Sequence, residues 1–258
     1  MSATVKTFFV SPRSGRIADS TLCQYFFLGA QASGNLRDSM GGASATKFDG
    51  SFTDGEAWAN AGFATTVSGG ATTDYFTRVA GAGHDFTLVG KALIFALRIK
   101  KATPVGNEII LGSFTSGSVY GGLQMTATST GSLQLACSPI DGSGNQTAAI
   151  SSTYPTLDGT EHFAMYAFGP DAVSVKQYVD GLPASTSGSG NASGKDCAGG
   201  NILNIGASRA GSAKDAQFGS IQQYNVPCAT LASLQTDAVA QWIFRNPHRP
   251  VPDWMWGL

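Results

Sequence analysis

The feature that most constrains this chain is a run of alternating side chains between Ala92 and Lys100. Every second residue from Leu93 to Ile99 is large and apolar, whereas Arg98 falls on the other side of an extended backbone. Successive side chains of a β-strand point to opposite faces, so this pattern predicts a half-buried strand. Its apolar side should lie in a core.

Short apolar runs separated by Gly, Pro and Asp continue through the rest of the chain, with the spacing typical of a β-sandwich. Asp180-Gly181 predicts a type I′ hairpin, because both central residues of that turn need positive φ. We expect a kink at Gly219 and a surface loop over the Ser/Gly-rich segment 185–200. Further strands are expected at 108–114, 120–128, 132–138, 162–168, 173–179, 202–205 and 218–226.

One helix is expected near the C-terminal end, from Thr230 to about Phe244. Thr230 can cap its first turn, and apolar residues then recur at spacings of three and four. These residues are Leu231, Leu234, Ala238 and Trp242. The stripe that they form should pack on the sandwich.

A Pro-rich tail follows the helix and carries Trp254, Met255 and Trp256. Prolines forbid a continued helix, so the tail should be extended. Each tryptophan can bury about 150–250 Å², and the tail must therefore either dock into another subunit or cover its own domain. We expect an assembly contact, since aromatic anchors on a pre-ordered arm suit an interface. Self-packing remains the alternative.

The composition excludes several classes of protein. Only 13% of the residues are charged and the formal net charge is −1, so the surface has no field that would attract nucleic acid. No stretch reaches the roughly 18 apolar residues of a membrane span, and the first residues lack the apolar run of a signal peptide. We expect synthesis in a cytoplasm. The four cysteines form no C-x-x-C pair, which predicts reduced or buried thiols.

Five short phrases follow one another along the chain. They are Tyr25–Leu28 with 35–39, Phe86–Leu88 with Ile94–Lys100, Tyr178–Gly181, Leu203–Gly206, and Phe218–Asn225 before the expected helix. In this order they resemble the concanavalin A-like and laminin-G-like jelly-roll domains. The resemblance implies an all-β, two-sheet antiparallel jelly-roll sandwich over 22–245, with one C-terminal helix. Residues 1–21 would then form an N-terminal arm and 246–258 an extended Pro/Trp tail.

Catalytic patterns are missing from the sequence. Retaining glycosidases need two carboxylates roughly 5 Å apart, and on this fold they commonly show a Glu-x-Asp-x-x-Glu arrangement. The glutamates stand outside such a pattern: Glu56, Glu108 and Glu161. The histidines available as bases are His84, His162 and His248, and no G-x-S-x-G elbow accompanies them. Gln222 and Gln223 stand where many relatives are acidic. We therefore expect no catalytic residue and no enzyme.

Binding residues can be proposed only one by one. We expect no cofactor; calcium is the cation to consider, with Asp38 in the loop of the first phrase as a candidate ligand. Asp141–Asn145 begins like an EF-hand loop, but Ser152 replaces the glutamate at its twelfth position and favours a plain turn. Sugar binding needs an aromatic platform. The candidate ligand-binding aromatics are Trp58, Tyr75, Tyr120 and Tyr154, each of which can also be a packing residue.

The leading hypothesis is a non-catalytic structural or interaction protein of a viral particle. A bacteriophage head-decoration, minor capsid or tail-associated protein, made in the host cytoplasm, fits the neutral surface and the tails. Its partners would be other virion proteins or copies of itself, with neither nucleic acid nor membrane. The alternative is a glycan-binding, lectin-like module that recognises a cell-surface receptor. A glycoside hydrolase is the third hypothesis.

Overall fold

The computed structural model describes fourteen stretches of the chain: 22–27, 46–48, 64–65, 75–79, 88–102, 108–112, 122–127, 133–138, 150–154, 157–171, 174–184, 202–205, 217–246 and 249–258. Side chains are described at 22–23, 88–99, 157–171, 174–184, 220–246 and 249–258. The expected arm 1–21 and the expected loop 185–200 lie outside the described residues.

The first antiparallel sheet has the strand order β1-β14-β5-β10-β11-β12, with β3 also paired to β14. Its strands are β1 (Cys23–Phe27), β3 (Ala64–Thr65), β5 (Lys91–Ala102), β10 (Asp158–Phe168), β11 (Val175–Val179), β12 (Leu182–Ala184) and β14 (Gln217–Pro227). β5 lies at its centre, between β14 and β10.

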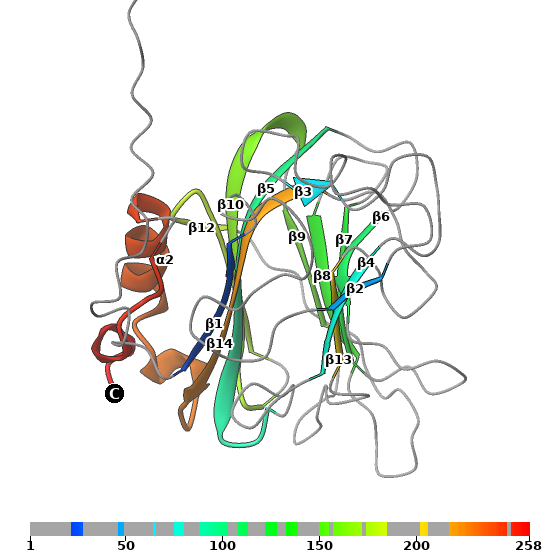
Figure 1. The fold of residues 1–258 in the computed structure, drawn as a ribbon. Helices are drawn as coiled ribbons and strands as arrows, with labels where there is room; N and C mark the ends of the chain where they lie inside the picture. The colour runs from blue at the N-terminus through cyan, green and yellow to red at the C-terminus, as the bar shows by residue number, and fades with distance from the viewer. Residues whose placement is uncertain are drawn as a thin grey trace, which may run out of the picture.

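The second antiparallel sheet has the order β2-β4-β13-β6-β7-β8-β9. Its strands are β2 (Thr46–Phe48), β4 (Tyr75–Val79), β6 (Glu108–Gly112), β7 (Gly122–Ala127), β8 (Leu133–Ser138), β9 (Ile150–Tyr154) and β13 (Ile202–Ile205). Figure 1 shows the two sheets as two layers, with the helix α2 (Thr236–Arg245) on the outer side of the first. The expectation of a mostly β chain with one C-terminal α-helix is confirmed for the described residues.

Two local predictions are confirmed. Asp180 and Gly181 have φ values of 46° and 82° and join β11 to β12, as a type I′ hairpin requires. The pairing of β14 with β5 shifts between Phe218 and Ser220, which places an irregularity at Gly219.

β5 differs from the half-buried strand that its alternation predicts. Leu93, Phe95 and Leu97 are buried, but so are Ala92, Ile94 and Ala96 on the opposite face. Arg98 is the first residue of that opposite face that is not fully buried. Both faces are covered over 92–97 because the second sheet lies on one side and the C-terminal segment on the other.

The face of the first sheet that is turned towards the second sheet is partly polar. Strand register places Gln223, Phe95, Tyr166 and Gln177 in one row across four strands, and all four are buried. Gln177 donates to the Tyr166 hydroxyl at 3.2 Å, and Gln223 donates to Asn225 at 3.0 Å. Buried amides of this kind need partners, so these pairs help to fix the register of the sheet.

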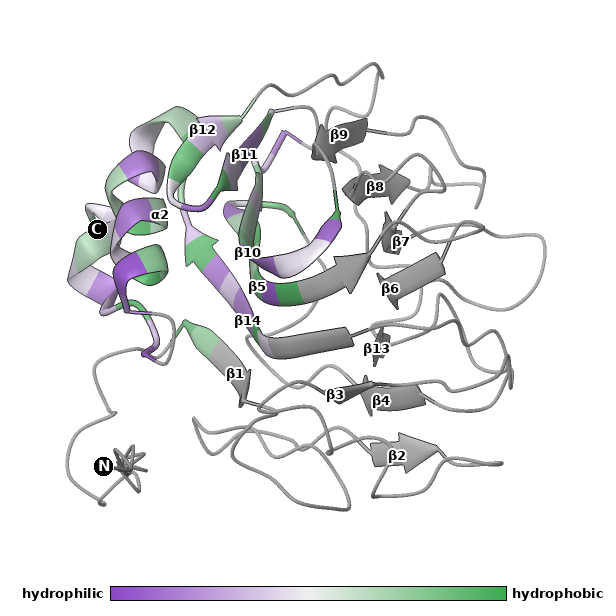
Figure 2. Ribbon diagram, turned by 90° about the horizontal axis from the view of Figure 1, so that it is seen from above, coloured by the Kyte–Doolittle hydropathy of each residue, from purple (hydrophilic) through white to green (hydrophobic). Residues whose placement is uncertain are grey.

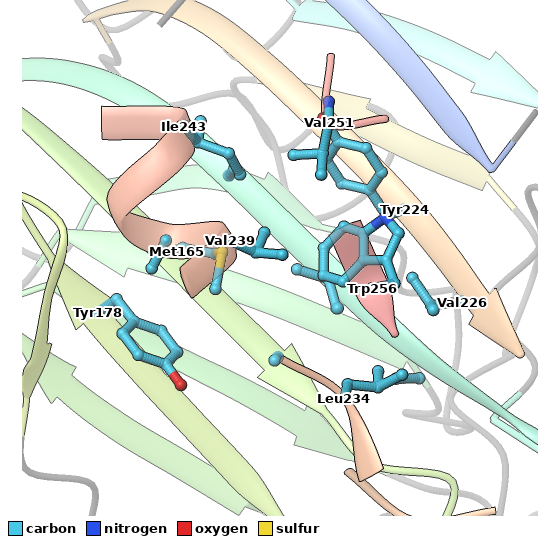
Figure 3. Close-up of a cluster of buried hydrophobic side chains, with 14 of the residues drawn as sticks. Met165, Tyr178, Tyr224, Val226, Leu234, Val239, Ile243, Val251 and Trp256 are labelled. Atoms are coloured by element: carbon cyan, nitrogen blue, oxygen red, sulfur yellow. The ribbon is translucent and has the colours of Figure 1, made fainter. Parts of the chain in front are cut away.

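The outer face of the first sheet carries a cluster of buried hydrophobic side chains (Figure 3), and the C-terminal segment lies over this face (Figure 2). From the sheet come Cys23, Ala92, Ile94, Ala96, Phe163, Met165, Ala167, Tyr178, Tyr224 and Val226. From the C-terminal segment come Leu231, Leu234, Val239, Ala240, Ile243, Val251 and Trp256. We call this set the outer cluster.

The helix differs from its expected span and face. Leu231–Ser233 forms a separate 3-10 turn (η2), and Leu234 is extended with φ −93° and ψ 144°. This break resets the helical phase, so the buried residues of α2 are Thr236, Val239, Ala240 and Ile243. Of the expected stripe, Leu231 and Leu234 are buried and Trp242 packs partly buried against the outer cluster, whereas Ala238 is exposed. The expected role of Thr230 as a side-chain cap is wrong, because its side chain makes no capping hydrogen bond.

The tail also differs from the expected extended arm. Asp253–Trp256 forms a 3-10 helix (η3), and Gly257 ends it in the left-handed conformation at φ 83°. Trp256 is fully buried, with its ring centroid 5.1 Å from that of Tyr224. The self-packing alternative therefore holds for Trp256, which is part of its own core and is not available to another subunit.

Polar contacts fix the start of α2 to β11. The Tyr178 hydroxyl lies 2.6 Å from Thr236 Oγ1 and also donates to the Asp237 carboxylate, while Lys176 Nζ donates to Thr236 Oγ1 at 2.9 Å. Burial raises the pKa of Tyr178, and the hydrogen bond to Asp237 adds to this shift, so the phenol stays a donor.

Replacing Tyr178 with phenylalanine is expected to lower the free energy of unfolding by about 1–2 kcal/mol, because the buried Thr236 hydroxyl loses a partner. Urea unfolding followed by circular dichroism measures the loss. An unchanged midpoint would show that this contact does not hold the helix to the sheet.

Two further expectations can be placed on the structure. No helix in the described part of the chain is long and apolar enough to cross a membrane. Cys23 is buried and Cys228 is half-buried, and burial raises the pKa of the Cys228 thiol. A raised pKa lowers the thiolate fraction and the reactivity of a cysteine, as expected of a structural residue.

Candidate functional site

Polar and titratable side chains gather where β10 begins, beside the turn between β11 and β12. The backbone fixes this arrangement first: the Asp180 amide donates to the Phe163 carbonyl at 2.9 Å. Phe163 in turn donates its amide to Asp180 Oδ1 at 2.8 Å. These two bonds hold the hairpin turn against β10 and leave Asp180 Oδ2 for another partner.

That partner is His162, which lies between two carboxylates. Its Nδ1 is 3.1 Å from Asp180 Oδ2 and its Nε2 is 3.3 Å from Asp158 Oδ1. Asp158 also accepts hydrogen bonds from the Thr160 amide at 2.8 Å and the Thr160 hydroxyl at 2.6 Å. We call Asp158, Thr160, His162 and Asp180 the rim cluster.

The electrostatics of the rim cluster favour charged side chains. Burial disfavours the imidazolium of His162, but the hydrogen bonds that its ring donates to the Asp180 and Asp158 carboxylates outweigh this effect and raise its pKa. Hydrogen bonds from Thr160, with a smaller contribution from His162, lower the pKa of Asp158 to about 2. The Asp158 side chain is 49% exposed, whereas that of His162 is only 19% exposed. The carboxylate thus remains open to solvent while the imidazole is largely enclosed.

Thr160, His162 and Asp180 have the connectivity of a nucleophile, a base and an orienting carboxylate. The Thr160 hydroxyl is 3.1 Å from His162 Nε2 but only 2.6 Å from Asp158 Oδ1. A carboxylate is the stronger acceptor, so the hydroxyl proton is directed to Asp158. An imidazole held between two carboxylates also favours the protonated form, which cannot accept a proton. The geometry therefore favours a structural role over an activated nucleophile.

A second ionic contact lies nearby on the other face of the sheet. Arg98 pairs with Glu161, which precedes His162 on β10 and therefore points to the opposite side. Two types of charged pair thus flank the start of β10. Neither was assigned a site role from the sequence.

The structure brings together few of the site residues expected from sequence. Trp58, Tyr120 and Asp38 lie outside the described residues. Tyr75 is the first residue of β4 and Tyr154 the last of β9, and only their backbone positions are described. Tyr154 precedes Asp158 by four residues, so the two Cα atoms are at most about 14 Å apart.

The three apolar residues of the tail differ in their exposure to solvent. Trp254 is 73% exposed, Met255 packs against the outer cluster and Trp256 is inside it. An assembly contact therefore remains a proposal for Trp254, with Met255 partly accessible beside it.

Metal binding finds no support in the described stretches, where no three His, Cys, Asp or Glu side chains are placed to hold an ion. Asp38 and Asp141–Asn145 are outside those stretches. Calcium binding by Asp38 stays a prediction.

Sequence reasoning missed the rim cluster. The pairs Asp158-Gly159 and Asp180-Gly181 predict turns. His162 is predicted to be a structural residue of a strand. The available signal was the spacing of Asp158 and His162, which both precede a strongly apolar strand. It could not indicate Asp180, because that contact depends on the pairing of β10 with β11.

Comparison with known proteins gives structural likeness without sequence relatives. No family profile matches the chain, and no curated protein sequence matches it. Among solved structures, the binding domain of botulinum neurotoxin serotype D is similar with a TM-score of 0.60 and 8% identity, over 87% of this chain and 50% of that one. The receptor-binding domain of the serotype C/D mosaic toxin gives 0.58 and 10%, over 90% and 52%.

A Trypanosoma rangeli sialidase is similar with a TM-score of 0.57 and 14% identity, over 86% of this chain and 32% of the enzyme. The chain thus spans about half the length of the toxin domains and about a third of the sialidase. At these identities the likeness shows the fold alone, which is a β-sandwich.

Proposed function

We propose that this chain is a non-catalytic glycan-binding module on a two-sheet, concanavalin A-like jelly roll. The observation that carries the proposal is the structural likeness, over most of the chain, to domains that recognise carbohydrate. One matching toxin domain is in complex with N-acetylneuraminic acid, and another toxin enters cells through two ganglioside molecules. The receptor-recognition alternative from the sequence is thereby better supported than the virion hypothesis.

The rim cluster supplies polar groups of the kind that bind sugar hydroxyls. Asp158 is half exposed, and Thr160 is exposed beside it. Carboxylates accept hydrogen bonds from vicinal hydroxyls, and an aromatic face next to them completes a typical sugar site. Of the four aromatic candidates, Tyr154 is four residues from Asp158 in the sequence, so its Cα lies within about 14 Å of that of Asp158. We propose Asp158 and Tyr154 as sugar contacts, with Trp58, Tyr75 and Tyr120 as the other aromatics to test.

A glycan array followed by calorimetry tests this proposal. The wild-type chain is expected to bind a defined set of glycans, and Tyr154→Ala is expected to weaken binding at least tenfold, because loss of a stacking face costs about 1.4 kcal/mol or more. Asp158→Asn is expected to weaken binding as well, and Asp171→Asn is its matched control. Asp171 caps the turn at the opposite end of β10 and β11, where it accepts from the Ser174 amide and hydroxyl at 2.8 and 2.6 Å.

If no glycan on the array binds the wild-type chain, the proposed function is contradicted. Binding that persists in Tyr154→Ala but is lost in Trp58→Ala would move the site away from the rim cluster. Hydrolysis of any bound glycan would replace the non-catalytic proposal with the hydrolase hypothesis.

A structural protein of an assembly is the second candidate. It is favoured by the exposed Trp254 and Leu258, which stand next to the buried Trp256 at the end of the described chain. A bacteriophage virion protein is one form of this candidate, although the structures named above are toxin domains and a sialidase. Co-purification with a large particle, lost in Trp254→Ala while folding is unchanged, would support it.

A further inference from the structure

His162 connects two parts of the fold that are distant in sequence. Asp158 and His162 belong to the start of β10, whereas Asp180 forms the turn of the β11–β12 hairpin. We propose that Asp158, His162 and Asp180 form a proton-operated clasp, which holds the hairpin to β10 when His162 is protonated and slackens when it is neutral. The clasp does not depend on glycan binding.

The hydrogen-bonding capacity of imidazole provides the mechanism. A protonated ring has two N–H donors, so Nδ1 can donate to Asp180 while Nε2 donates to Asp158. A neutral ring has one donor and one lone pair. In either neutral tautomer, one carboxylate therefore faces a lone pair at 3.1 or 3.3 Å, and that contact becomes repulsive.

Among the described residues, Asp158 and Asp180 contact the His162 ring with their carboxylates. Thr160, which lies 3.1 Å from Nε2, is neutral. Across the strand pair, His162 lies opposite Ile99, and Phe163 lies opposite Arg98. Arg98 is paired with Glu161, whose strand partner is Lys100, and Glu161 points to the opposite face of the sheet from His162. The hairpin contributes Leu182 beyond Asp180 and Gly181, and no further charge up to residue 184.

The direction of the pH dependence follows from the raised pKa of His162. A pKa above the unfolded value means that the stabilisation is complete below about pH 6.5 and is lost as the pH rises through the folded pKa. Asp158 sets the acid limit, because its pKa of about 2 means that its contribution is lost only as the pH falls from about 4 towards 2. The clasp is therefore tightest in mildly acidic solution.

The segment that the clasp controls has a local reporter. The Asp180 amide is hydrogen-bonded to Phe163, and Gly181 lies close to Phe244 of α2, with Leu182 exposed beyond it. Opening of the hairpin breaks the Asp180 amide bond while most of the sheet stays folded. Hydrogen exchange at this amide therefore reports on the clasp separately from global unfolding.

The test compares the wild-type chain with His162→Gln and Asp180→Asn at pH 5.5 and pH 8.5. Asparagine tolerates the positive φ of residue 180 and keeps a carbonyl acceptor, so it removes mainly the charge. His84→Gln and His248→Gln are the controls, since the chain has three histidines. Between pH 5.5 and pH 8.5, the Tm of the wild type is expected to fall by about 2–4 °C more than that of His162→Gln. The protection factor of the Asp180 amide, which is its exchange rate corrected for the intrinsic pH dependence of exchange, is expected to fall about five-fold more in the wild type than in His162→Gln.

A direct NMR titration of His162 in the wild type completes the test. A pKa above 6.5 that drops in Asp180→Asn supports the clasp. A His162 pKa at or below 6.5, or the same pH dependence of Asp180 exchange in wild type and His162→Gln, would overturn it. If His162→Gln fails to fold, the titration and Asp180→Asn still decide. If the wild-type chain binds no glycan but its His162 pKa lies above 6.5 and drops in Asp180→Asn, the proposed function is contradicted and the clasp is supported.

Discussion

Replacement of Trp256 with alanine is expected to lower the free energy of unfolding by about 3–5 kcal/mol, as removal of a fully buried tryptophan does. The indole packs on Tyr224, whose hydroxyl accepts the Val251 amide at 2.9 Å and donates to Gln222. The substitution would therefore open a cavity between η3 and the sheet and loosen this polar link. Urea unfolding of the purified monomer measures the effect.

Trp254→Ala is the matched control for this prediction, because Trp254 is two residues away but 73% exposed. We expect its stability to stay within about 0.5 kcal/mol of the wild type. Deletion of 247–258 should lower the Tm of the isolated chain, since Val251 and Trp256 leave the outer cluster together. An unchanged melt for Trp256→Ala or for the deletion would contradict the packing and return the tail to an assembly role.

Phe95→Ala is the second large effect, with an expected loss of about 3–5 kcal/mol. Phe95 is fully buried at the centre of the first sheet, where it lies opposite Tyr166 on β10 and Gln223 on β14. Truncation leaves a cavity in a strand whose two faces are both covered, so the surroundings can relax only slightly. Chemical unfolding with a two-state fit measures the loss.

Val89→Ala serves as the control for Phe95, because Val89 is exposed in the turn just before β5. It should change stability by less than about 0.5 kcal/mol. A loss below about 1 kcal/mol for Phe95→Ala would mean that β5 is not the central buried strand.

Local signals were sufficient for much of the fold. A period of two in side-chain hydropathy predicted β5, and Asp180-Gly181 predicted the hairpin because few other pairs adopt two positive φ values. The expected strands at 108–114, 132–138 and 202–205 correspond to β6, β8 and β13, with shifts of a few residues at their ends. β2, β3, β4 and β9 were not expected. β2 and β3 are only three and two residues long, and β9 is rich in hydroxyl side chains.

Burial on the outer face of β5 depended on a distant segment. Ala92, Ile94 and Ala96 are small or apolar, so the whole run from 92 to 97 reads as continuous apolar sequence, which is typical of a strand covered on both faces. The alternation at 98–100 obscured that signal. This face is covered by α2 and η3. Which residues of α2 face the sheet could not be predicted from the sequence, because the extended Leu234 separates η2 from α2.

The rim cluster shows the limit of sequence reasoning for sites. Each of its residues has an ordinary local role: Asp158 and Asp180 stand before glycine in turns, and His162 lies in a strand. Their chemistry arises from strand register, which places Phe163 beside Asp180 and thereby directs the Asp180 carboxylate to His162. Register at this edge is a tertiary property that no local pattern specifies.

The central position of β5 has a consequence for biosynthesis. On the ribosome, 92–97 emerges well before its neighbours β10 and β14, and before η2, α2 and η3, which close the outer cluster. Non-local pairing of this kind slows folding, and an unpaired apolar strand is prone to intermolecular association. Nascent chains that end before β14 therefore present an unpaired apolar strand that can associate with other chains. Products that end before β14 should accumulate as aggregates and not as smaller folded domains.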